Sequence, residues 1–141
     1  MKILFATLFA FTRASLAYAI SVGDTSIYTS VLGGQSHEIA TTVTLVGDDL
    51  YAETTTIDGS SETSNYYAIS AVKYRYQVAA DCVQNGGTVE NVETPIKTFS
   101  ACKISVGSHI FWASSEVPFG YVKSFSWSSY RTDTIKAFIK H

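Results

Sequence analysis

The sequence predicts an all-β, single-domain protein: an antiparallel β-sandwich or small barrel with one disulfide. Three observations support this fold class, namely period-2 alternation along most of the chain, turn signals at short intervals and a single pair of cysteines. The length of 141 residues fits one domain and is enough to bury a core. With only 16% charged residues, the composition excludes a coiled coil and a charged disordered tail.

Residues 1–19 have the three parts of a secretory signal peptide. Lys2 gives a basic start, residues 3–11 form an apolar run, and small residues then end in an A-x-A sequence at Ala19. The predicted cleavage lies between Ala19 and Ile20. The apolar run is shorter than the roughly 20 residues that span a bilayer, so no stable membrane span is expected.

The expected mature protein is a single β domain over 20–141, secreted into the extracellular space. Arg13 interrupts the hydrophobic segment, which leaves open an organellar transit peptide or an uncleaved N-terminal strand or helix. The sequence also leaves open whether a secreted product later enters host cells.

Short alternating segments separated by turn residues predict the strands. Residues 37–46 alternate throughout, and so do residues 66–79, whose second face becomes polar toward its end. The polar stretch 58–64 predicts a mobile hairpin loop, and 132–140 fits a helix and a strand equally well. The predicted strands are 26–32, 37–46, 50–57, 66–79, 88–93, 96–104, 107–113 and 120–128.

Cys82 and Cys102 lie in the mature part of the chain and are its two cysteines. In an oxidising compartment such a pair predicts one disulfide, which would close a loop worth about 3 kcal/mol on the chain-entropy model. The alternative is two buried, unpaired thiols that pack as small hydrophobic groups.

Charge divides the expected mature chain into two parts. Residues 20–141 hold eight basic and twelve acidic side chains, a net charge of −4. Residues 20–93 carry a net charge of −8 and residues 94–141 one of +4. The two parts either interleave in the fold or form a dipolar surface with one basic, aromatic face. The acidic balance argues against nucleic acid as a partner.

No catalytic signature, metal site or cofactor motif is found, so we expect a protein that is not an enzyme and needs no cofactor. The three histidines lack metal-ligand spacing, and there is no nucleophile elbow, P-loop or dinucleotide fingerprint. One enzymatic alternative stays open: a small hydrolase or ribonuclease using His37, Glu38, Arg75 and His109.

Aromatic and basic residues are concentrated between 111 and 131. In a strand over 120–128, Tyr121, Lys123, Phe125 and Trp127 share one face. That face is either buried in the core or exposed as a flat platform that binds sugars or anionic partners. The predicted binding residues are Phe119, Tyr121, Lys123, Trp127 and Arg131.

Four features of the chain can be compared with known proteins: its length, the predicted signal over 1–19, the Cys82/Cys102 pair and the Ser/Thr/Tyr-rich strands. In these features the whole chain resembles the small secreted β-sandwich proteins that plant-associated fungi release as effectors or elicitors. The resemblance implies a virulence-associated role in manipulating a host or being sensed by it. It carries over no functional residue.

The leading hypothesis is therefore a secreted, non-enzymatic interaction protein that binds a host protein or a cell-wall component. An extracellular carbohydrate-binding module is the second hypothesis, and the small secreted hydrolase or ribonuclease is the third. The sequence does not define the oligomeric state.

Overall fold

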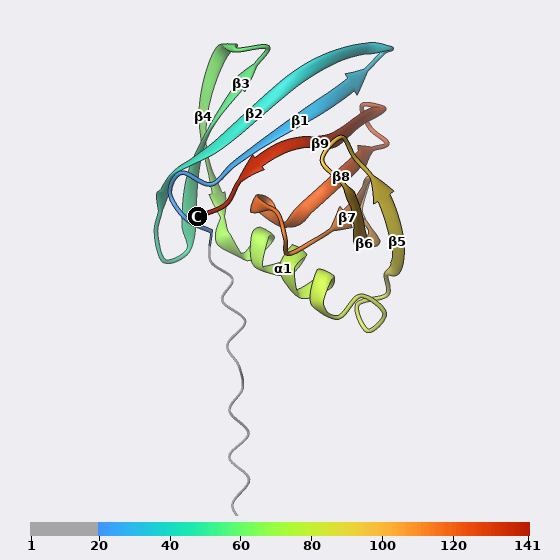
Figure 1. The fold of residues 1–141 in the computed structure, drawn as a ribbon. Coiled ribbons are helices and arrows are strands. Elements are labelled where there is room, and N and C mark those ends of the chain that lie inside the picture. The colour runs from blue at the N-terminus through green and yellow to red at the C-terminus, as the bar shows by residue number, and fades with distance from the viewer. Residues whose placement is uncertain (1–19) are drawn as a thin grey trace, which may run out of the picture.

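The computed structural model describes residues 20–141, apart from the side chain of Ser61. The predicted signal peptide, including Ala19 of the cleavage site, lies outside these residues. The predicted antiparallel β fold is confirmed: within residues 20–141, nine strands form one sheet, accompanied by one α-helix (Figure 1). The strands are β1 (Thr25–Leu32), β2 (Gln35–Val46), β3 (Leu50–Ile57), β4 (Ser60–Ala68), β5 (Thr88–Glu93), β6 (Thr98–Val106), β7 (His109–Ala113), β8 (Tyr121–Ser126) and β9 (Arg131–Ile139).

The strand order in the sheet is β4-β3-β2-β1-β9-β8-β7-β6-β5, and all neighbouring strands are antiparallel. Hairpins connect most neighbours, and β1 joins β9 at the centre. The helix α1 (Ile69–Ala80) carries the chain from edge strand β4 to edge strand β5. The strands thus belong to a single sheet, which is not closed into a barrel.

The sheet is strongly bent, so that its two outer arms face each other across a concave side (Figure 1). Register shifts interrupt four of the strand pairings: β1 with β9, β2 with β3, β3 with β4, and β7 with β8. Such bulges add local twist and bending to a strand. The bend allows strands that are far apart in the sheet order to line one cavity.

The helix α1 replaces most of the strand predicted over 66–79, and that part of the prediction is wrong. Apolar residues in this segment satisfy two periodicities at once. Ile69, Val72 and Tyr76, spaced three and four apart as on one face of a helix, are buried, and so is Val78. The segment forms a helix because it crosses from one edge of the sheet to the other. Along that path it has no neighbouring strand to pair with.

Two smaller predictions are settled by strand pairing. The segment 58–64, predicted as a loop, is mostly the beginning of β4, and only a tight turn at Asp58 and Gly59 separates it from β3. The ambiguous segment 132–140 lies mainly in β9, because β1 and β8 flank it on both sides.

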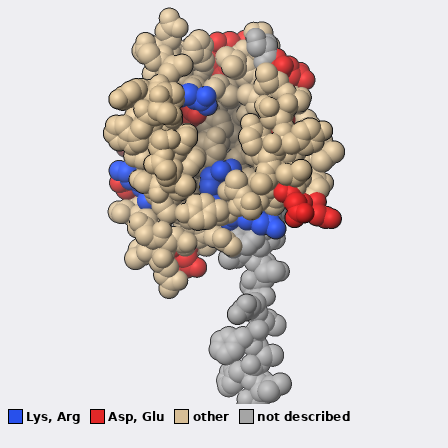
Figure 2. All heavy atoms as spheres, turned by 180° about the vertical axis from the view of Figure 1, so that it is seen from behind, with Lys and Arg blue, Asp and Glu red and all other residues tan. Residues whose placement is uncertain are grey.

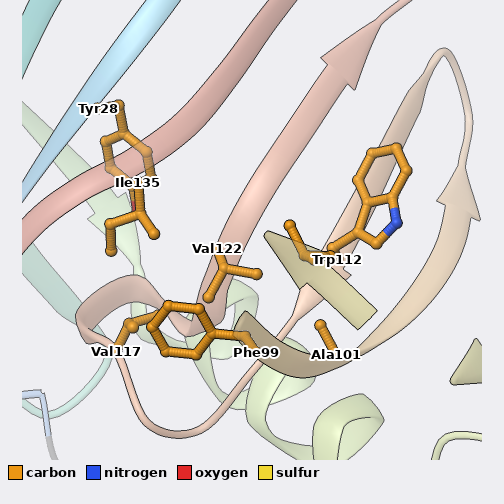
Figure 3. Close-up of a cluster of buried hydrophobic side chains, with 8 residues drawn as sticks. Tyr28, Phe99, Ala101, Trp112, Val117, Val122 and Ile135 are labelled. Atoms are coloured by element: carbon orange, nitrogen blue, oxygen red, sulfur yellow. The ribbon is translucent and has the colours of Figure 1, made fainter. Parts of the chain in front are cut away.

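Buried side chains of residues 20–141 form three clusters, two of which are larger than the third. In the first, Phe99, Val117 and Val122 are almost completely buried and point toward one another (Figure 3). The second lies beneath α1 and includes Val43, Val72 and Ile20, the predicted first residue of the mature chain. Each fully buried aliphatic or aromatic side chain stabilises the fold by roughly 1.5–3 kcal/mol.

The predicted disulfide between Cys82 and Cys102 is confirmed, with a Cα–Cα distance of 5.5 Å. It joins the turn after α1 to β6 and packs against Gly87. A Cβ atom at Gly87 would lie 2.4 Å from the Cys102 Sγ atom, so only glycine fits beside the bridge. The disulfide therefore fixes the C-terminal end of α1 against the sheet.

Candidate functional site

The concave side of the sheet contains a cleft, which we call the central cleft. It consists of three adjoining hollows of about 250, 270 and 250 Å³ that all share Tyr121. In space-filling view this face is hollowed, with blue Lys or Arg atoms beside the hollow (Figure 2). The rings of the cleft belong to Tyr28, Tyr51, Tyr67, Phe111, Phe119 and Tyr121. Its charged or titratable groups are Glu53, Arg75, His109, Arg131 and Asp133, and its small polar groups include Thr41, Thr55, Thr63, Asn65, Ser124 and Ser126.

Strand register explains how one arm of the sheet builds its wall of the cleft. Tyr51 is paired with Tyr67, and Glu53 with Asn65, across β3 and β4. Residues two apart on a strand share a face, so these aromatic and polar groups all project to the concave side. The opposite wall comes from β7, β8 and β9, and α1 closes one end.

The aromatic rings of the cleft contact one another in ordered pairs. Tyr28 and Tyr121 are stacked, with ring centroids 5.0 Å apart and an interplanar angle of 12°. Tyr51 and Tyr67 stack at 5.8 Å, and the Phe111 ring meets Tyr121 edge-on, also at 5.8 Å. Paired rings restrain one another and present flat apolar surfaces with hydroxyl groups at their edges.

Arg75 enters the cleft from α1. Its guanidinium lies 5.4 Å from the Tyr121 ring centroid and 5.9 Å from that of Phe111, within the range of cation–π attraction. Its Nε donates a hydrogen bond to the backbone carbonyl of Phe119. No carboxylate oxygen in residues 20–141 lies within 4 Å of this half-buried cation.

An unusual backbone segment holds the carbonyl that accepts this bond. Phe119 has φ +63° although it is not a glycine, and Gly120 follows with φ +75°. A Cβ atom at residue 120 would lie 2.9 Å from the Arg75 Cβ, so the glycine permits close approach of the loop to α1. Positive φ at a phenylalanine is a strained conformation of the kind often found at functional sites.

Glu53 is a half-buried carboxyl on the same arm as Tyr51. Burial raises the pKa of Glu53, while the hydrogen bond from the Tyr51 side chain and the charge of Arg75 oppose part of that increase. Burial likewise raises the pKa of the Tyr28 and Tyr121 hydroxyls, which therefore remain protonated donors.

Arg131 and Asp133 form an ion pair at the far side of the cleft. The Arg131 Nη2 lies 2.7 Å from Asp133 Oδ2, and its Nε lies 2.9 Å from Oδ1. Asp133 is buried, and Ser124 donates a weaker hydrogen bond to it at 3.5 Å. The bidentate geometry neutralises both charges, so this pair contributes shape and polarity more than net charge.

The residues predicted to share one face of strand 120–128 lie on different sides of the sheet. Tyr121 lies in the central cleft together with Ser124 and Ser126, whereas Lys123 lies over the Trp112 ring at 4.8 Å and lines none of the three hollows. The physical reason is the register shift at Trp112 and Ala113, which inserts Val122 as an extra residue and turns Tyr121 to the concave side.

The remaining predicted binding residues also lie in different environments. Phe119 is 3% exposed and belongs to the core cluster beneath α1, although it also lines the cleft. Trp127 follows the end of β8 and is 55% exposed, packed edge-on against Phe125. Arg131 lines the cleft through its pair with Asp133. The binding role of these residues stays a prediction.

The four residues of the hydrolase alternative do not gather at one place. His37 binds Asp58 at 2.8 Å in the β3–β4 turn, and Glu38 pairs with Lys136. Arg75 and His109 both lie in the cleft, where each contacts the Phe111 ring. His37 and Glu38 line none of the cleft hollows.

No family model, curated protein or solved structure matches this chain. In residues 20–141, no group of three or more His, Cys, Asp or Glu side chains is arranged to hold a metal ion. The helix within that described range is too short to cross a membrane.

Sequence reasoning missed Glu53, Tyr67 and the positioning of Arg75. A signal for Arg75 existed: on a helix it lies three residues after Val72 and one before Tyr76, next to the buried stripe. Glu53 carried a weaker signal, because a charged residue on the same strand face as Tyr51 and Thr55 indicates that this face is not fully buried. Only the register of β3 with β4 places these groups in one cleft.

Proposed function

We propose that this chain is a secreted, non-enzymatic binding protein that receives a cell-wall glycan in the central cleft. The main observation behind this proposal is the lining of the cleft. Aromatic rings from β1, β3, β4, β7 and β8 surround it, and its remaining walls are rich in hydroxyl, amide and carboxyl groups. A sugar has the matching chemistry, with apolar C–H faces that pack on aromatic rings and a rim of hydroxyls that form hydrogen bonds.

The non-enzymatic part of the proposal is supported by the state of the cleft carboxyls. Asp133 is held by two hydrogen bonds from Arg131 Nε and one from Nη2, and so is occupied rather than free to act on a substrate. The Tyr51 side chain interacts with Glu53 and lowers the pKa of its carboxyl, against the larger effect of burial. We therefore expect a bound oligosaccharide to be recovered intact.

Two neighbouring tyrosines on β4 provide a matched test. Tyr67 lines the cleft and stacks on Tyr51, whereas the adjacent Tyr66 lines none of its hollows and is 70% exposed. Once an array of cell-wall oligosaccharides has identified a binding sugar, calorimetry would compare the two alanine variants. We expect Tyr67→Ala to weaken binding about three- to tenfold and Tyr66→Ala to leave it within twofold.

Three outcomes of this experiment would contradict the proposal: no sugar on the array binds, the two variants lose affinity equally, or the bound sugar is cleaved. Cleavage that disappears in Glu53→Gln would show that the protein is a glycosidase. Mass spectrometry of the sugar after prolonged incubation measures this directly.

Export is tested on the protein recovered from culture medium. The proposal predicts an intact mass for a chain that starts at Ile20 and gains two alkyl groups only after reduction. A full-length chain, or cysteines that react without reduction, would contradict secretion.

A host protein is the second candidate partner, of the effector or elicitor kind. It is favoured by the exposed aromatic pair Trp127 and Tyr130, 55% and 72% exposed, at the turn between β8 and β9. This turn is anchored by the Trp127 amide, which donates to the Ser108 carbonyl at 2.9 Å. A folded double variant, Trp127→Ala with Tyr130→Ala, that leaves the host response unchanged would eliminate this turn as the binding face.

A further inference from the structure

Arg75 contrasts with the Lys and Arg side chains of residues 20–141 that form ion pairs. Lys97, Lys103, Lys136 and Arg131 each lie within 4 Å of a carboxylate. In the same residues Arg75 forms no ion pair, although it is half-buried in a cleft beside two rings. Glu53 lines the same hollow and is influenced by the charge of Arg75, but it does not lie within 4 Å of the guanidinium. A half-buried cation without a directly bonded carboxylate is costly, and its attraction to an anion is stronger there than in bulk water.

The local structure also orients this guanidinium. The Nε bond to the Phe119 carbonyl uses one of its five N–H donors and restrains the plane of the group. The two rings beside it restrict its movement further. The Nη groups remain available in a cleft wall, in a form suited to two parallel hydrogen bonds with a carboxylate.

We propose that Arg75 anchors an anionic group, so that the ligand of the central cleft is a sugar bearing a carboxylate. This inference rests on the proposed function, because it specifies the sugar that the cleft receives. The rings hold the apolar faces of the sugar, and Arg75 binds its acid group. The ion pair of Arg131 with Asp133 is already neutral and contacts sugar hydroxyls at the other side.

The first experiment changes the ligand and leaves the protein untouched. Calorimetry with the 20–141 protein would compare a hexamer of galacturonic acid with its fully methyl-esterified form, which has the same length and no charge. The acid is expected to bind about tenfold to a hundredfold more tightly, the difference made by one charge-assisted bidentate contact.

The outcomes separate this inference from the proposed function. Equal affinity for acid and ester would overturn the carboxylate anchor and leave glycan binding in place. Tighter binding of a sulfated hexamer than of the carboxylate hexamer would overturn the choice of carboxylate. Absence of binding by these and by all neutral sugars would overturn the proposed function itself.

The second experiment changes Arg75. Arg75→Gln should lower affinity for the acid hexamer by about tenfold to a hundredfold and leave affinity for the ester unchanged. Arg75→Lys keeps the charge without the planar fork and should give an intermediate affinity. Lys73→Gln, which removes an exposed cation of the same helix that lines none of the cleft hollows, is the matched control.

Near-UV circular dichroism would show whether each variant is folded. If Arg75→Gln does not fold, Arg75→Lys and the acid–ester pair still decide the question. An Arg75 variant that folds and keeps the full preference for acid over ester would overturn the assignment.

Discussion

Glu53 shows how one residue links the cleft to the stability of the fold. Its carboxyl faces Tyr51 on the same strand, Tyr67 on β4, Arg75 on α1 and Tyr121 on β8. Burial is the largest influence on it and raises its pKa. The ionised form is therefore less favourable in the folded protein than in the unfolded chain.

The sign of the resulting pH dependence follows from linkage. A raised folded-state pKa gives a stabilising contribution that is complete below the ordinary pKa of glutamate and is lost as pH rises through the folded value. Glu53→Gln, which is neutral at every pH, should raise the melting temperature at pH 7. The difference from the wild type should shrink as the pH falls to about 4. Thermal melts over this range, with the exposed Glu62→Gln as control, measure it. A difference that stays constant or grows on acidification would contradict this view of Glu53.

At the scale of elements, the contact between α1 and the segment before β8 determines the shape of the cleft. Arg75 and Gly120 touch there, and the Tyr76 hydroxyl donates to the Val117 carbonyl at 3.1 Å. This contact joins α1, the one α-helix of residues 20–141, to the short 3-10 helix η1 (Pro118–Gly120), and so to the strand that carries Tyr121.

Gly120→Ala tests this contact. The new methyl group would meet Arg75 at 2.9 Å, and alanine would also be strained at φ +75°. Gly34→Ala is the matched control, because Gly34 has φ +79° with nothing within 4 Å of the added carbon. We expect Gly34→Ala to lower the free energy of unfolding by about 1–2 kcal/mol and Gly120→Ala by about 1–3 kcal/mol more. Denaturant unfolding measures both, and equal losses would show that the close approach to Arg75 has no energetic consequence.

Sequence patterns predicted the elements whose periodicity is unambiguous. Residues 37–46 and 50–57 alternate and are strands, and the cysteine pair forms its disulfide. The helix over 69–80 was missed because its apolar residues fit both periods, and only the need to cross between the sheet edges distinguishes them. The positions of Tyr121 and Lys123 on different sides could not be predicted, because the extra residue that separates them is defined by pairing with β7.

At the scale of the whole molecule, the bend of the sheet creates the cleft that we propose as the binding site. It brings β3 and β4 opposite β7 and β8, strands that lie far apart in the sheet order, and so creates a cleft that no single strand encodes. The two parts of the chain with opposite net charge also meet in the fold, since Lys136 pairs with Glu38 and Lys103 with Glu90. The charge asymmetry of the sequence is therefore partly neutralised within the protein.

The measurement that tests the central claim most directly is amide chemical-shift mapping of the ¹⁵N-labelled 20–141 protein, titrated with the galacturonate hexamer. Binding in the central cleft predicts that the largest shifts fall on residues of β3, β4, α1 and β8 around Tyr67, Arg75 and Tyr121. Shifts confined to Trp127, Tyr130 and their turn, or no shifts at millimolar sugar, would contradict the claim that this cleft is the binding site.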